Sequence, residues 1–188
     1  LRRGFVINSQ RQIDAMVERG AYQERDSQSP APAQPQTPDS PFHRYDALHS
    51  RLKLICDSLE SLPEAGQVAP EQITAFCSDV QELCGLEGDA LLAAVHLVHE
   101  GRDSVIHALH SVTLTEMLLD SQKVTEAERL SILAAALTQN VGMMTLHDSL
   151  CKQKEPLSES QKIGIKQHPR KSLEALQGMG VKDSLWLN

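Results

Sequence analysis

Histidines are the side chains in this sequence whose spacing could support chemistry. His96 and His99 lie three residues apart in a segment with helical periodicity, so they could share a metal ion on one face. His147 and Asp148 form a literal His-Asp pair, another donor set that suits a divalent metal. We expect plainer roles for both: an exposed histidine pair without a ligand function, and a polar loop surface at 147–148.

Two predicted helices position the other candidates. Each helix begins with a capping box, in which the first side chain accepts from the backbone three residues on: Thr125 with Glu128, and Ser158 with Gln161. The first helix is predicted to be buried and to run to Leu137, and the second carries His168. Gly142 lies between them and can end the first helix or allow a close backbone approach.

The sequence from about residue 85 to residue 188 resembles HD-GYP domains, a branch of the HD phosphohydrolase superfamily. That family has a helix ending in His-Asp, then hydrophobic-Gly-Lys, a crossing segment, a Lys-Pro-Gly-x-Leu-Thr/Ser turn and a helix ending in His-Pro. The matching positions here are Gln139-Asn140, Val141-Gly142-Met143, Thr145 to Leu150, Lys152 to Ser158, and His168-Pro169, with His110 at the family's first histidine ligand.

The departures from the family pattern bear on function. A two-metal phosphohydrolase requires a carboxylate that bridges the cations and neutral imidazoles at the other positions. Asn140 has no charge, Gln139 has no imidazole, and Met143 stands where the family has a phosphate-supporting lysine. Ile106 replaces the glutamate that binds a third metal in some members. We therefore expect no bound metal or other cofactor and no catalytic residue.

The resemblance defines a set of degenerate metal-site positions: His110, Gln139, Asn140 and His168. We expect the two amides to face the two histidines and to form a neutral hydrogen-bonded network in place of the metal site. Lys152 and Lys154 are possible phosphate contacts, and Lys166 and Arg170 could extend that basic patch. Solvated surface lysines are the favoured interpretation of the patch.

Composition favours helices and excludes some functions. Hydrophobic residues make up 40% of the 188 residues but aromatic residues only 3%, so leucine and alanine must fill the core. The net charge of −7 argues against nonspecific binding to nucleic acid, which requires a basic surface. No apolar run reaches the roughly 18 residues of a membrane span. The cysteines at 56, 77, 84 and 151 form no Cys-x-x-Cys pair, and we expect free buried thiols in the cytoplasm.

The predicted fold class is all-α, an HD-type helical bundle at 42–188 that stops before the family's Gly-Tyr-Pro motif. Its helices are predicted at 42–62, 70–85, 88–100, 104–122 and 125–137, followed by the helix that begins after Ser158. The first two are predicted to bury apolar stripes: Tyr45, Leu48, Leu52, Ile55 and Leu59 in the first, and Ile73, Phe76, Cys77, Val80, Leu83 and Cys84 in the second. A short strand-helix fragment is predicted at 1–22, similar to a module that often precedes HD-GYP domains. Residues 23–41 contain five of the nine prolines and are predicted to be a linker.

Three functions follow as alternatives. The favoured one is a non-catalytic regulatory domain related to cyclic di-GMP phosphodiesterases, which acts through a protein partner, through self-association or by sensing the nucleotide. The second is a cyclic di-GMP phosphodiesterase, or another phosphohydrolase, with a rebuilt metal site. The third is a purely structural interaction bundle. An intact His-His-Glu and Gly-Tyr-Pro sequence after residue 188 would favour an enzyme or a nucleotide binder, and a degraded one a scaffold.

Overall fold

The computed structural model describes residues 40–60 and 68–188. The described residues all belong to one compact unit of the chain, Pro38–Asn188. The strand-helix fragment predicted at 1–22 and nearly all of the predicted linker at 23–41 lie outside the described residues.

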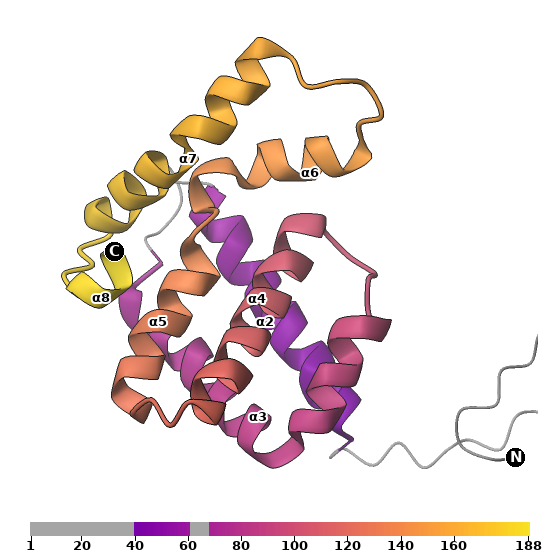
Figure 1. Cartoon of the computed structure of the whole chain (residues 1–188), viewed down its shortest axis with the longest axis vertical. Coiled ribbons are helices and arrows are strands. Elements are labelled where there is room, and N and C mark those ends of the chain that lie inside the picture. The colour runs from indigo at the N-terminus through magenta and orange to yellow at the C-terminus, as the bar shows by residue number, and fades with distance from the viewer. Residues whose placement is uncertain (1–39, 61–67) are drawn as a thin grey trace, which may run out of the picture. The chain divides into compact units, whose positions relative to one another are not determined.

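Every regular element in the described residues is helical, which confirms the prediction of an all-α helical bundle (Figure 1). The elements are α2 (Pro41–Glu60), α3 (Pro70–Leu97), α4 (Asp103–Ser121), α5 (Glu126–Thr138), the 3-10 turn η1 (Val141–Met143), α6 (Met144–Lys152), α7 (Glu159–Gly178) and α8 (Ser184–Leu187). Helices α2 to α5 pack against one another, α7 packs on η1, and α8 packs on α5.

The core lies between α2, α3, α4 and α5, where the sequence places apolar residues at helical spacing. The predicted stripe of α2 is buried as a whole: Tyr45, Leu48, Leu52, Ile55 and Leu59. The predicted stripe of α3 is also buried, except for a half-exposed Cys84: Ile73, Phe76, Cys77, Val80 and Leu83. With few aromatic residues available, leucine fills much of this core.

Helix starts follow their local sequence closely. The Thr125 side chain accepts a hydrogen bond from the Glu128 N–H at the start of α5. Ser158 and Gln161 form the complete predicted capping box of α7, since each side chain also bonds the other residue's backbone N–H. Pro70 occupies the first turn of α3, where its missing N–H is harmless.

Helix α3 differs from the prediction of two separate helices. Gly85 does not end a helix, and the chain continues helically to Leu97 rather than to residue 100. Glu87, with φ −137° and ψ 33°, interrupts the helical backbone and produces a kink. The predicted break is therefore present, two residues later than expected, as a kink instead of a loop.

The predicted crossing at 145–150 is wrong in its structure, because these residues belong to α6. The family's crossing contains a proline, whereas the first proline after Gly142 in this chain is Pro156. Without a proline to remove a backbone donor, the segment from Met144 continues as a helix and buries that methionine.

Candidate functional site

Three of the four degenerate metal-site positions, Gln139, Asn140 and His168, lie around the junction between the end of α5, η1 and the middle of α7, whereas His110 lies on α4. Helix α5 ends at Thr138, and Gln139 and Asn140 connect it to η1. At Gly142 the two segments approach so closely that an added Cβ would lie 2.7 Å from both the His168 carbonyl oxygen and the Ser172 backbone nitrogen. Because these are backbone atoms, only glycine fits without a shift, which agrees with the predicted close approach.

Ser172 joins the two sides of this junction. Its buried hydroxyl donates to the Gln139 carbonyl oxygen at 2.8 Å and accepts from the Gly142 N–H at 2.9 Å. One side chain thus satisfies two backbone groups left without partners where α5 ends. The sequence analysis missed Ser172, since nothing local distinguishes it from other serines.

The predicted network of amides and histidines is not formed. The exposed Gln139 side chain donates from Nε2 to the Ala136 carbonyl oxygen at 3.0 Å, within its own helix end. In the described part of the chain, no hydrogen bond links the side chain of Gln139 or Asn140 to His110 or His168. Asn140 instead lines a narrow cavity of about 10 Å³ beside His107 and Cys56. The prediction failed because each histidine finds a backbone partner nearer to itself.

His110 lies on α4 against the chain that follows α3. Its ring is hydrogen-bonded to the Val98 backbone and lies edge-to-face with His99 at 5.9 Å between ring centroids. Burial, followed by the neighbouring His99, lowers the pKa of His110, so the ring is neutral at pH 7. The Nε2 atom is buried and has no hydrogen-bond partner among the described residues.

His168 is held by its own helix. Its Nδ1 lies 2.6 Å from the Ile165 carbonyl oxygen, and a carbonyl only accepts, so Nδ1 carries the proton. Pro169 has no N–H to donate to that same carbonyl, four residues before it. The expected helix end at His168-Pro169 is therefore wrong: α7 continues through Pro169 to Gly178, with the imidazole replacing the missing backbone donor.

An open hollow of about 670 Å³ lies beside Gln139 on the face formed by α5, α7 and α8. Its walls include Thr138, Arg170, Ser172 and Trp186. Arg170 is the one charged residue in the lining, and its guanidinium is paired with Glu174 at 3.0 Å on the exposed surface of α7. The hollow combines apolar walls with one cation beside Gln139, the one candidate position in its lining.

The predicted phosphate contacts do not gather around the candidate positions. Lys152 is exposed at the end of α6, and Lys154 is exposed in the segment between α6 and α7. Met143 is half-buried at the end of η1. Arg170 is the member of the predicted basic patch that shares a cavity with Gln139.

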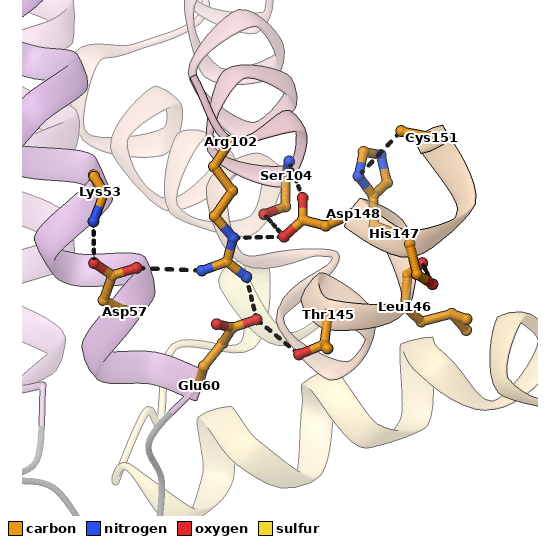
Figure 2. A network of polar contacts seen from close by, with 11 residues as sticks. Lys53, Asp57, Glu60, Arg102, Ser104, Thr145, Leu146, His147, Asp148 and Cys151 are labelled. Carbon is orange, nitrogen blue, oxygen red and sulfur yellow. Dashed lines mark hydrogen bonds and ion pairs between the residues drawn. The ribbon is translucent and has the colours of Figure 1, made fainter. Parts of the chain in front are cut away.

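The most developed polar cluster lies elsewhere, around Arg102 (Figure 2). The guanidinium forms ion pairs with three carboxylates from two helices. Asp57 and Glu60 of α2 contact its terminal nitrogens, Asp57 at 3.2 Å, and Asp148 of α6 contacts Nε at 2.5 Å. Thr145 of α6 also donates to Glu60 at 3.0 Å. This Arg102 network joins α2 and α6 to the start of α4.

Asp148 also caps α4, which corrects its predicted role as loop surface. Its carboxylate accepts from the Ser104 N–H at 2.7 Å and from the Ser104 hydroxyl at 3.1 Å, at the positive end of the helix. Burial by itself would raise the pKa of Asp148, but the hydrogen bonds from Arg102 and Ser104 outweigh burial and lower it. The sequence could not reveal this cluster, because the partners in each of its contacts lie more than 40 residues apart.

His147 and Cys151 occupy one face of α6 beside the Arg102 network. The Cys151 sulfur lies 3.8 Å from His147 Nδ1, and the His147 ring stacks on His107 of α4 at 5.2 Å between centroids. Burial, followed by the neighbouring His147, lowers the pKa of His107. Cys151 is exposed and Cys84 is only partly buried, whereas Cys56 and Cys77 are buried as expected, and all four are free.

A second polar cluster is buried between α3, α4 and α5. Glu116 pairs with Arg129 at 3.2 Å and accepts from Gln81 at 3.3 Å, while Arg129 also pairs with Asp120 at 2.6 Å. Burial raises the pKa of Glu116 in spite of these partners. Gln81 and Glu116 are buried while Asp120 is exposed at the outer edge, and the cluster ties the three helices together.

Comparisons with known proteins give no further guidance. No protein-family model, no curated protein and no solved structure matches this chain. In residues 40–60 and 68–188, no three histidine, cysteine, aspartate or glutamate side chains are arranged to hold a metal ion. Within that part of the chain, His96 and His99 therefore have no third side chain of these types placed to complete a metal site with them. No helix in the same residues combines the length and apolar character required to cross a bilayer.

Proposed function

We propose that this chain is a non-catalytic regulatory domain, related to HD-GYP cyclic di-GMP phosphodiesterases, that acts by binding another protein chain. The support is the order of motifs around the junction of α5 and α7, in which amides replace the bridging carboxylate and its histidine. The resemblance further implies bacterial signalling and a cytoplasmic location. Hydrolysis of cyclic di-GMP is the part of this resemblance that an assay can test directly.

The observation that carries the proposal is the closed α5–α7 junction. Ser172 and Gly142 hold the two backbones together, and the Gln139 amide is turned to its own helix. The Nδ1 atom of His168 is already hydrogen-bonded to the Ile165 carbonyl oxygen. A bridging metal pair would require a carboxylate at Asn140, and an uncharged amide is a poor substitute for one.

A hydrolysis assay tests this proposal. The full chain is incubated with cyclic di-GMP and Mn²⁺, and linear dinucleotide is measured against a no-protein control. We expect no product above the control, because no activated water is available without a metal. Product formation that scales with protein concentration and is abolished by His110→Ala would contradict the proposal and restore the enzyme alternative.

Nucleotide sensing is a second candidate, favoured by the hollow beside Gln139. Its size suits a small organic ligand, and Arg170 provides one cation for a phosphate. Calorimetric titration with cyclic di-GMP should then show binding that Arg170→Ala weakens and that Lys182→Ala, at an exposed lysine outside the hollow, leaves unchanged. Equal affinities of both variants would reject this site.

A further inference from the structure

Helix α7 is long but contributes little to the core. Of its 20 residues only Ser172 and Leu176 are buried, and both lie in its second half. Ile163 in the first half is 52% exposed, and Leu157 in the preceding segment is 42% exposed. In Figure 1 the beginning of α7 and the segment that joins it to α6 project away from α2 to α5. Helices in proteins gain most of their stability from packing, so this half of α7 has a free packing surface.

The same region is basic within an acidic protein. Residues 152–171 contain six lysines and arginines but two glutamates, a net charge of +4 in a chain whose total is −7. Lys162 pairs with Glu159 and Arg170 with Glu174, but these exposed pairs one turn apart are weak. We call Leu157, Lys162, Ile163 and Lys166 the α7 face. Its charge and its exposed apolar groups suit an acidic partner that also presents apolar side chains.

Helix α3 has this complementary chemistry. It contains five carboxylates and no lysine or arginine, although Asp79 is paired with Arg51 of α2 and that arginine lines the same hollow as Glu82 and Leu86. Leu86 is 62% exposed and lies four residues, about one helical turn, after the exposed Glu82, and Asp89, just beyond the kink at Glu87, is exposed as well. We call Glu82, Leu86 and Asp89 the α3 face. Leu86 flanked by carboxylates on the α3 face is therefore complementary to Ile163 flanked by lysines on the α7 face.

We propose that a second copy of this chain binds here, with the α7 face of each copy on the α3 face of the other. Among the described residues of one copy, α3 and α7 are not one of the closely packed helix pairs, so we place the two faces against each other between copies. A reciprocal arrangement uses both pairs of faces and closes as a two-fold dimer. This inference deepens the proposed function, which requires binding to another chain, by naming the partner.

Charge reversal with mixing tests the proposal on the full chain. Sedimentation velocity is recorded over a concentration series for wild type, Lys166→Glu, Glu82→Lys and an equimolar mixture of these two variants. Each variant alone places like charges against each other at both contacts, and we expect its dimer to be about tenfold weaker or more. In the mixture one contact is the wild-type pair and the other is the same pair reversed, so dimerisation should return to the wild-type level.

Lys182→Glu is the matched control, because it makes the same charge change outside residues 152–171 and should leave association unchanged. Wild-type association should also weaken at high salt, as expected for exposed charges. Circular dichroism verifies that each variant is folded. A wild type that is monomeric throughout, a mixture that does not recover, or a control that weakens the dimer equally would overturn the proposal. A monomeric wild type would overturn the dimer without affecting the proposed absence of catalysis. Product in the hydrolysis assay would overturn the absence of catalysis without affecting the dimer, so the two failures are distinguishable.

Discussion

His168 illustrates how a histidine that directly precedes a proline can support the helix backbone. A proline within a helix removes one hydrogen bond and leaves the carbonyl four residues earlier without its donor. In this chain the residue directly before Pro169 provides an imidazole N–H to that carbonyl, at 2.6 Å. The His-Pro pair therefore allows α7 to continue across a residue that ordinarily ends helices.

His168→Ala should destabilise the chain by about 1–3 kcal/mol, because the Ile165 carbonyl is partly buried and loses its donor. Urea unfolding followed by circular dichroism measures this change. Gln167→Ala is the control, since that side chain is exposed and the same helix should tolerate alanine well. Equal midpoints for both variants would show that the imidazole does not support α7. The double variant His168→Ala with Pro169→Ala should recover the loss, because alanine at 169 restores the backbone donor.

Helix α6 is the element that depends most on ionic contacts. It buries one residue, Met144, yet Asp148 and Thr145 tie it to three residues of the bundle: Glu60, Arg102 and Ser104. Asp148 connects the start of α4 to Arg102, whose other ion pairs reach α2. Because apolar burial by α6 is small, the Arg102 network is the main restraint on its position.

Asp148→Asn should therefore destabilise the protein at neutral pH by about 1–3 kcal/mol, through loss of a charge-assisted hydrogen-bond network. The folded-state pKa of Asp148 is lower than its unfolded value of about 3.9, so the carboxylate contributes fully above that value. Its contribution disappears as the pH falls through the folded-state pKa. The difference between wild type and Asp148→Asn should accordingly be constant from about pH 5 to pH 7 and shrink below about pH 4.

Urea midpoints at a series of pH values measure this dependence, and Asp46→Asn, at an exposed carboxylate of α2 outside both proposed contact faces, is the control. A wild-type advantage that persisted undiminished at about pH 2 would show that the carboxylate's charge is not what holds α6.

Prediction from the sequence worked for elements whose signals are local. The caps at Thr125 and Ser158 and the apolar stripe of α2 were predicted because each depends on residues within one or two turns. The crossing at 145–150 was wrong because it followed a family pattern whose proline this chain lacks. At the site, Gly142 was predicted correctly, but Ser172 and Arg102 were not, since their partners lie about 30 or more residues away in sequence.

At the scale of the whole molecule, the last helix is tied to the core through the chain's single tryptophan. Trp186 is buried, and its Nε1 donates to the Thr138 hydroxyl at 2.9 Å at the end of α5. Asp183 begins α8 by accepting from the Leu185 N–H, and it accepts from the Ser131 hydroxyl of α5 as well. These contacts attach α8, which follows α7 in the chain, to α5, which precedes η1. Helix α7 therefore lies between two parts of the chain that are both anchored to the bundle.

Residues 40–188 should consequently unfold as one cooperative unit, with Trp186 fluorescence and far-UV circular dichroism changing at the same urea concentration. Thr138→Val removes the acceptor of the indole N–H while preserving shape, so it should lower stability by about 1–3 kcal/mol and shift both transitions together. Thr115→Val, at a half-exposed threonine on the wall of the neighbouring hollow, is the control and should shift neither. A fluorescence transition that precedes the loss of helix would show that α7 and α8 detach before the α2–α5 bundle unfolds, in contradiction to a single unit.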